Sequence, residues 1–118
     1  GCEGMKQDCI FCRIAAGDLP ASIVYQDDRV VAFNDIHPVA PKHVLIVPRE
    51  HVEALSGTGP EQEELLGHLL RVAPEVAKAA GVLGSGYRVA INQGKDAGQL
   101  IPHLHLHVIG GKSLGRMA

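Results

Sequence analysis

Three histidines alternate with leucines in the run His103–Ile109, close to the C-terminal end of the chain. Strict alternation of polar and apolar residues predicts a β-strand with one buried face. Because successive side chains of a strand point to opposite faces, His103, His105 and His107 are expected to share one face. Imidazole can attack an electrophile, donate a proton or bind a metal near neutral pH. We interpret the run as a reactive face; the alternative is a polar strand face with incidental histidines.

The loop before this run carries groups that suit an anion. Gly94 and Gly98 let backbone N–H groups approach a ligand closely, and Asn92 and Gln99 add neutral donors. Histidines beside anion-binding amides favour phosphoryl chemistry, in which one imidazole attacks phosphorus while the others orient it and handle the leaving-group proton. The simpler alternative is a flexible connection between two strands.

A metal site built from the same histidines is a second interpretation. A His-x-His pair on a strand places two imidazoles on one side, and a third imidazole with a carboxylate could complete a zinc site that activates water. However, no acidic residue follows in the run. Three alternate strand positions also span roughly 13 Å, which is too wide for one ion. At most two of the three histidines could bind one metal together.

A Cys-x-x-Cys pair lies near the start of the chain, at Cys9 and Cys12. On a helical turn the two thiols come close together, as both redox and zinc sites require. Taken alone, the pair leaves three possibilities open: half of a zinc site, a redox pair, or buried thiols without a role.

The remaining segments are expected to position these groups. The expected elements are a short helix capped by Asp8 and stopped by Gly17, a hairpin of Ser22–Gln26 and Val30–Asn34 turning at Asp27 and Asp28, a proline-rich loop over 35–41, a strand over His43–Pro48, one helical turn over Val52–Leu55, a long helix over Pro60–Ala80, and a strand over Tyr87–Gln93. Pro74 lies inside the long helix, where it predicts a kink.

The composition sets the class of protein. A chain of 118 residues with 46% hydrophobic and 20% charged residues forms one domain, expected over residues 9–118. A net charge of −2 does not favour a nucleic-acid polymer as partner, and no apolar run is long enough to span a membrane. Residues 1–8 are interpreted as a disordered or cloning-derived segment. Three cysteines do not suit a secreted disulfide framework, so we expect a cytoplasmic protein.

Several stretches of the chain resemble the histidine-triad (HIT) nucleotide-binding superfamily, most closely its Hint branch. The triad pattern is matched in full by His103–Ile109, and supporting matches cover the chain from about Cys9 to Gly111: Ala32–Ile36, Ala40–His43, Leu66–Leu69, Asn92–Gly94 and Gly98 with Gln99. The resemblance implies a small α+β fold with an antiparallel sheet, one long helix and one short N-terminal helix. It also implies a homodimer, which we expect to form through the Leu65–Ala80 helix and the Tyr87–Gln93 strand.

The resemblance also implies roles for individual residues. His105 would be the nucleophile, His103 and His107 would orient and stabilise the intermediate, and His43 would complete the catalytic group. Asn92 and Gln99, with the backbone of Gly98 to Leu100, would hold phosphate. Asp35 matches the ribose-binding carboxylate, and the base pocket is matched by Ile10, Phe11, Leu19, Phe33 and Ile36.

In relatives with the cysteine pair, two histidines complete a zinc site. The matching residues are Cys9, Cys12, His51 and His103, a ligand set that leaves no open position and is therefore structural.

The sequence departs from the Hint pattern at two positions and in its tail. Leu100 stands where a Ser or Thr is common, so one hydroxyl donor near the phosphate is lost. Pro102 replaces an aromatic residue, and the ending Lys112–Ala118 is short.

The function predicted by this resemblance is a purine nucleotidyl hydrolase that cleaves at the α-phosphate. Its substrates would be AMP or GMP conjugates of the nucleoside phosphoramidate type, and its intermediate a nucleotidyl-histidine. The alternatives are a dinucleoside polyphosphate hydrolase or nucleotidyltransferase of the same superfamily, and a nucleotide-binding scaffold module with incidental turnover.

Overall fold

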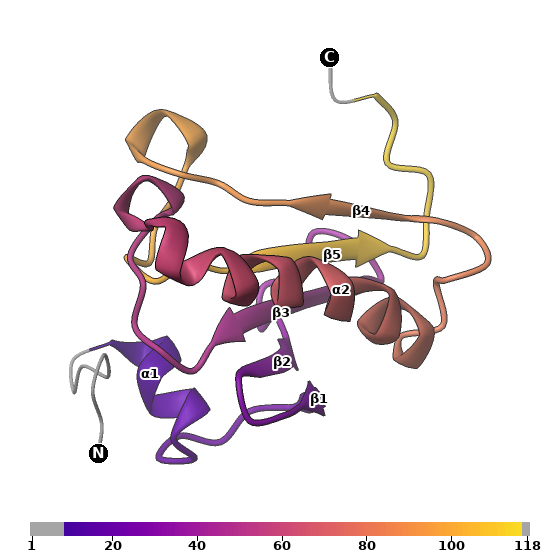
Figure 1. Ribbon diagram of the computed structural model, residues 1–118. Helices are drawn as coiled ribbons and strands as arrows, with labels where there is room; N and C mark the ends of the chain where they lie inside the picture. The colour runs from indigo at the N-terminus through magenta and orange to yellow at the C-terminus, as the bar shows by residue number, and fades with distance from the viewer. Residues whose placement is uncertain (1–8, 117–118) are drawn as a thin grey trace.

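The computed structural model describes residues 9–116, so the prediction for residues 1–8 lies outside the described residues. The helices are α1 (Ile10–Ala15) and α2 (Glu63–Ala79), with 3-10 turns η1 (Leu55–Gly57), η2 (Pro60–Gln62) and η3 (Lys95–Ala97). The strands are β1 (Ile23–Gln26), β2 (Val30–Asn34), β3 (Lys42–Pro48), β4 (Tyr87–Ala90) and β5 (Leu106–Gly110). The strands form one antiparallel sheet in the order β1-β2-β3-β5-β4 (Figure 1). The α+β architecture with one long and one short N-terminal helix is therefore confirmed.

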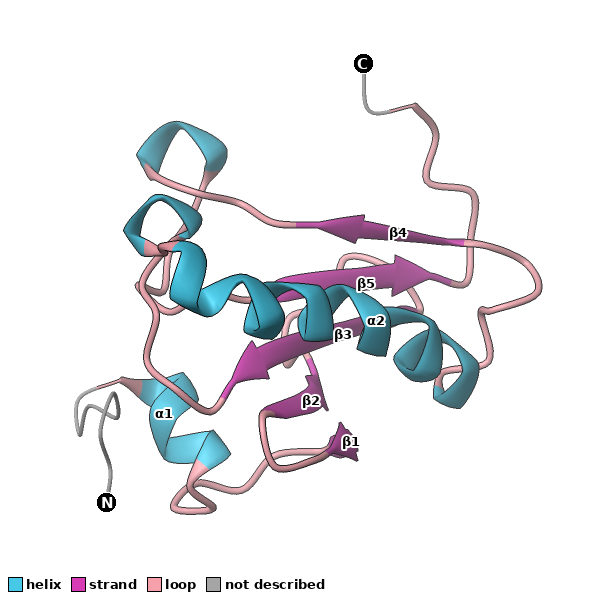
Figure 2. Ribbon diagram, in the orientation of Figure 1, coloured by secondary structure: helices cyan, strands magenta, loops and turns pink. Residues whose placement is uncertain are grey.

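Strands β2 and β3 are buried on both faces, and their alternating side chains contribute to two separate cores. Ile46 of β3 joins the core under α2, whereas its neighbour Leu45 joins the core under α1. This division follows from the two-residue period of a strand. The long helix α2 lies along one face of the sheet, while α1 is set apart near one end of β3 (Figure 2). Because α1 has only six residues, it covers part of its face and leaves room for a pocket.

Arg49 fastens α1 to the hairpin of β1 and β2. Its guanidinium donates to the carbonyl oxygens of Ala15 at 2.6 Å and Asp27 at 2.8 Å. These two acceptors belong to the end of α1 and to the hairpin turn, so a single side chain closes the C-terminal end of the helix against the sheet. The residues that α1 carries are thereby held in a defined place.

The expected long helix is present, with the 3-10 turn η2 as its first turn. Gly59 precedes Pro60, which takes the first position of that turn, and α2 continues on both sides of Pro74. The buried stripe of α2 consists of Leu65, Leu69, Val72, Ala73, Val76 and Ala77. No described helix is long and apolar enough to cross a lipid bilayer.

Two predictions outside the reactive face were wrong, one for a helix cap and one for a helical turn. The cap of α1 is Cys9, not Asp8, because the Cys9 sulfur accepts the N–H of Cys12. The expected helical turn over Val52–Leu55 is replaced by η1, since the Val52 side chain is buried in the core and its carbonyl accepts the N–H of Leu104.

The predicted strands at the reactive face are shorter than expected. The last strand begins at Leu106, not His103, because the backbone of Leu104 bonds to Val52 outside the sheet. Strand β4 ends at Ala90, where its pairing with β5 ends at His107. His103 and His105 therefore lie in an irregular segment that enters the strand.

Candidate active site and metal centre

A pocket of about 830 Å³ opens on the face of the sheet that carries α1. On this face it extends from α1 to the connection between β4 and β5. The predicted residues that line it are Ile10, Phe11, Leu19, Phe33, Asp35, Ile36, His43, Asn92, Gly98, Leu100, His105 and His107. Residues from six segments of the chain thus share one cavity.

His105 forms part of the pocket floor, with only 8% of its surface exposed. Its Nδ1 lies 2.7 Å from the carbonyl oxygen of His103. A carbonyl can only accept, so Nδ1 carries the proton and donates it to this oxygen. The remaining nitrogen, Nε2, then holds a lone pair, which is what a nucleophile requires. The ring of Phe11 packs edge-on against the imidazole at a centroid distance of 5.2 Å and limits its orientations.

His43 and His107 form a hydrogen-bonded pair with a defined tautomer. The N–H of Val39 donates to Nδ1 of His43 at 3.2 Å, so the proton of this neutral ring lies on Nε2. Nε2 of His43 is 2.8 Å from Nδ1 of His107 and donates to it. The proton of a neutral His107 therefore lies on Nε2, which is 3.4 Å from Nδ2 of Asn92. Both groups are donors, so both are available to an anion in the pocket.

The neutral state of this pair follows from burial. Desolvation, together with the neighbouring rings of His105 and His43, lowers the pKa of His107 to about 4, although the carboxylate of Asp35 opposes the shift. Desolvation also lowers the pKa of His43, although the carboxylate of Asp35 opposes the shift. At neutral pH the two rings thus act as hydrogen-bond donors without positive charge.

One side of the pocket is apolar and one carboxylate borders it. Phe11 and Phe33 meet edge-to-face at a centroid distance of 5.6 Å, and Ile36 stands 83% exposed at the rim. Asp35 accepts the N–H of His37 through Oδ1 at 2.9 Å and places Oδ2 3.5 Å from Nε2 of His43. A flat apolar ligand bearing hydroxyl groups would fit between these groups.

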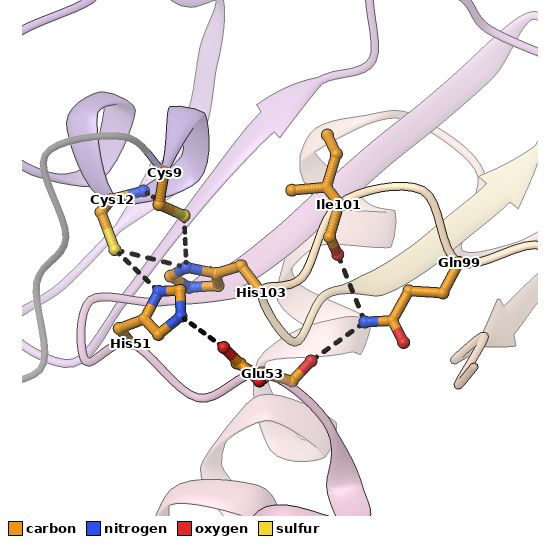
Figure 3. Close-up of polar contacts among 7 residues, drawn as sticks. All are labelled: Cys9, Cys12, His51, Glu53, Gln99, Ile101 and His103. Atoms are coloured by element: carbon orange, nitrogen blue, oxygen red, sulfur yellow. Dashed lines mark hydrogen bonds and ion pairs between the residues drawn. The ribbon is translucent and has the colours of Figure 1, made fainter. Parts of the chain in front are cut away.

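Two predicted residues do not line the pocket. His103 is fully buried outside the lining of the pocket, and its carbonyl oxygen accepts the hydrogen bond that orients His105. Gln99 uses its side chain within the protein: Oε1 accepts the N–H of Gly94 at 2.9 Å, and Nε2 donates to the carbonyls of Glu53 at 2.9 Å and Ile101 at 3.2 Å (Figure 3). Its amide therefore holds the loop in place.

Sequence reasoning missed several residues that line the pocket: Ile14, Pro20, Ala21, Ser22, Asn34, His37, Val39, Leu45 and Ile101. Leu45 could have been found, because it pairs with Phe33 across two antiparallel strands. Most of the others lie in loops, whose paths the periodicity of the sequence does not describe.

The cysteine pair lies next to two histidines, as the resemblance implied. Cys9 Sγ is 3.2 Å from Nδ1 of His103, and Cys12 Sγ is 3.2 Å from Nδ1 of His51 and 3.5 Å from Nδ1 of His103 (Figure 3). All four ligand atoms lie within 4.8 Å of one another. Three segments that are far apart in the sequence meet in this cluster.

These four residues fit a tetrahedral zinc ion. Nε2 of His103 lies 2.9 Å from the carbonyl of Pro48 and donates to it, so the lone pair of Nδ1 faces the two sulfurs. Zinc bonds of about 2.3 Å to sulfur and 2.0 Å to nitrogen place the ligand atoms roughly 3.5 Å apart, close to the distances found. Nε2 of His51 is buried without a hydrogen bond in the described part of the chain, and Glu53 Oε1 is 3.9 Å away. Neutral thiols donating to the two imidazoles would also satisfy this geometry.

A second cluster of possible ligands, Asp35, His43 and His107, lies in the pocket itself. Nε2 of His43 carries a proton that is already donated to His107, because the N–H of Val39 occupies the other nitrogen. If a metal bound Nε2 of His43, the ring proton would move to Nδ1 and would face the N–H of Val39, which cannot accept it. We therefore interpret this cluster as a hydrogen-bonded chain.

An antiparallel sheet in which the last strand and the segment leading into it bring His105 and His107 to a pocket defines a small α+β protein of the histidine-triad type. The HIT domain model matches residues 16–114, and the chain belongs to this family.

Relatives cover nearly the whole chain. The purine nucleoside phosphoramidase of Escherichia coli K12 is 40% identical over 113 residues, which is 96% of this chain and 95% of that protein. A histidine triad protein of Clostridium difficile is 43% identical with a TM-score of 0.91, over 96% of this chain and 98% of that one. A zinc-bound histidine triad family protein of Mycobacterium smegmatis is 32% identical with a TM-score of 0.76, over 94% and 80% of the two chains.

Proposed function

We propose that this protein hydrolyses purine nucleoside phosphoramidates, conjugates of AMP or GMP with an amine, at the α-phosphate. The observation that carries the proposal is the hydrogen bond from His105 to the carbonyl of His103 at 2.7 Å, which leaves the lone pair of Nε2 at the pocket floor. The name of the 40% identical relative from Escherichia coli supports the choice of substrate class.

The reaction has two steps. In the first, Nε2 of His105 forms a bond to phosphorus while the bond from phosphorus to the leaving nitrogen breaks, and that nitrogen keeps the electron pair and takes up one proton. The proton comes from water that enters through the pocket mouth, while the Nε2–H of neutral His107 keeps its proton and hydrogen-bonds to the phosphate. In the second step, water adds its hydroxyl to phosphorus, the bond to His105 breaks, and the remaining proton of that water passes to the solvent, which balances the proton taken up in the first step. The products are an amine and a nucleoside monophosphate.

The substrate is held by the two sides of the pocket. The base occupies the apolar side formed by Ile10, Phe11, Leu19, Phe33 and Ile36. Asp35 accepts from the ribose hydroxyls. Asn92 and the backbone beside Gly98 donate to phosphate oxygens, and His107 adds its N–H to them. Gln99 contributes by holding this loop.

Zinc in the Cys9, Cys12, His51 and His103 cluster completes the proposal. The ion would act as a structural clamp, because the four residues leave no position for substrate. It would join α1, the segment after β3 and the segment before β5. Since His103 also holds His105, the clamp would fix the backbone that orients the nucleophile.

A homodimer is the proposed assembly. Strand β4 pairs only with β5 among the described strands, and it presents Val89 with 38% of its surface exposed. Leu70 of α2 is 58% exposed on the outer side of the helix. An edge strand with no neighbour on one side and an exposed leucine on a helix are both features of an association surface, and two copies can cover them symmetrically.

The test is parallel incubation with adenosine phosphoramidate and diadenosine tetraphosphate, followed by mass spectrometry of the rapidly quenched protein. We expect release of AMP from the phosphoramidate and a nucleotidyl adduct on the peptide that contains His105. Preferential cleavage of the dinucleotide would support the polyphosphate hydrolase instead. Binding of AMP without turnover of either compound, even at high enzyme concentration, would support a binding module.

A further inference from the structure

The mouth of the pocket carries an unusual leucine. Leu100 is 91% exposed, yet it lines the cavity that contains His105. An exposed leucine contributes nothing to the core, so its side chain is available to whatever emerges from the pocket. Two other exposed apolar residues, Ile36 at 83% and Val39 at 62%, border the same opening.

The position of Leu100 is fixed by its neighbours. The side chain of Gln99 bonds to the backbone of Glu53 and Ile101 (Figure 3) and accepts the N–H of Gly94. Ile101 packs against the core under α1. The residues on both sides of Leu100 are thus anchored. The backbone that carries Leu100 is therefore fixed on both sides, and this places the leucine side chain at the mouth of the pocket.

The geometry of phosphoryl transfer tells which part of the substrate meets this leucine. The attacking and leaving atoms lie roughly in line through phosphorus. Because His105 attacks from the floor, the leaving group points toward the mouth. Leu100 lies in the β4–β5 connection with the phosphate donors Asn92 and Gly98, whereas Ile36 and Val39 lie beside Asp35. Leu100 therefore borders the leaving-group side, and the other two border the nucleoside side.

The charges of the pocket point the same way. Among the described lining residues there is no lysine or arginine. A polyphosphate leaving group would carry several negative charges past this opening without a cation to receive them, whereas an apolar amine would find the leucine side chain.

We propose that Leu100 is a specificity-determining residue that selects substrates with an apolar leaving group, an inference that rests on the hydrolase function proposed above. Contact with the leucine shields apolar surface of the leaving group from water. The contact is one-sided and partly wet, so the expected preference is about tenfold in kcat/KM for an alkylamine over an amine with a charged end.

The test compares AMP joined to n-hexylamine with AMP joined to aminohexanoate, an amine of similar length that ends in a carboxylate. We expect the wild-type protein to prefer the hexylamine conjugate, and Leu100→Ser to reduce the ratio of the two kcat/KM values about fivefold. Leu100→Met should keep the ratio, because it restores an apolar side chain of similar volume.

Two control variants separate this effect from general ones. Leu83→Ser removes another exposed leucine, 47% exposed and outside the lining residues, and should leave both rates unchanged. Val39→Ser alters the nucleoside side of the mouth and should change both rates by the same factor. Thermal unfolding of each variant shows whether it folds.

The possible results separate the two proposals. Turnover of both conjugates with a ratio that Leu100→Ser does not change would overturn the role of Leu100 and leave the hydrolase standing. No turnover of either conjugate by the wild-type protein would overturn the hydrolase, and the role of Leu100 with it.

Discussion

The carbonyl oxygen of His103 accepts a hydrogen bond from Nδ1 of His105 at 2.7 Å, while the ring of His103 faces two cysteine sulfurs. One residue therefore completes the Cys9, Cys12, His51 and His103 cluster with its side chain and orients the proposed nucleophile with its backbone. The candidate active site and the candidate metal site are adjacent because the irregular segment before β5 passes through both.

Replacing the nucleophile should separate chemistry from binding. His105→Ala removes the atom that forms the covalent intermediate, so we expect turnover of an AMP–amine conjugate to fall at least about 10³-fold. Affinity for AMP should stay within about tenfold, since the apolar side of the pocket and Asp35 remain. Steady-state kinetics and calorimetric titration with AMP measure the two quantities. Substantial remaining turnover would point to a water-activating mechanism that does not need this imidazole.

Removing the cysteines should remove the metal. Elemental analysis of the wild-type protein is expected to find about one zinc per chain, and Cys9→Ser with Cys12→Ser to find none. Because the ion joins three segments, its loss should also lower the midpoint of thermal unfolding by at least about 5 °C. Activity should fall only through disorder of His103. A metal-free wild-type protein with full stability and activity would show that the cysteines are ordinary thiols.

The buried histidine pair should make stability depend on pH. Burial lowers the pKa of His107 to about 4, whereas an unfolded histidine titrates near 6.5. Below about pH 6.5 the unfolded chain binds more protons than the folded protein, so the free energy of unfolding falls as the pH drops from 6.5 toward 4. Above pH 6.5 the ring is neutral in both states, and this loss of stability is absent. Taken in full, this pKa difference corresponds to about 3 kcal/mol. Because His107 is only half-buried, screening by water reduces the expected loss for His107 alone to about 2 kcal/mol.

Urea unfolding of the wild-type protein and of His107→Gln, at several pH values, measures this effect. The variant lacks one titrating group, so its stability should change less steeply with pH over this range. Equal slopes for both proteins would show that His107 is not the source. His43, whose pKa burial also lowers, contributes in the same direction and remains in both proteins.

The edge strand β4 should hold two subunits together. One chain has a mass of 12.5 kDa, and light scattering at micromolar concentration should give twice that value. Val89→Lys places a charge on the exposed edge and should shift the protein toward monomer. Ile23→Lys is the matched control, because Ile23 is 42% exposed on the opposite edge strand β1. A monomeric wild-type protein, or dissociation by both variants alike, would contradict an interface at β4.

Much of the architecture follows from local pattern in the sequence. The hairpin of β1 and β2, strand β3 and helix α2 lie where alternation and helical periodicity indicate them. These patterns reflect which side chains must leave water, and within a regular element those side chains recur with the period of the strand or helix, which can be read from the sequence. The reactive histidines and the cysteine pair are also visible in the sequence, because their residue types limit the chemistry they can do.

The roles within the site needed the tertiary structure. By alternation alone His103, His105 and His107 look equivalent, and only the family resemblance gave them different roles. In the structure the backbone is outside the sheet before Leu106. This departure turns His103 toward the cysteines and aims its carbonyl at His105. Gln99 similarly resembles a phosphate ligand, yet its amide bonds to three backbone groups of its own chain. Which partner a polar group takes depends on segments distant in sequence, such as Glu53 and Pro48, and only folding brings these within hydrogen-bond distance.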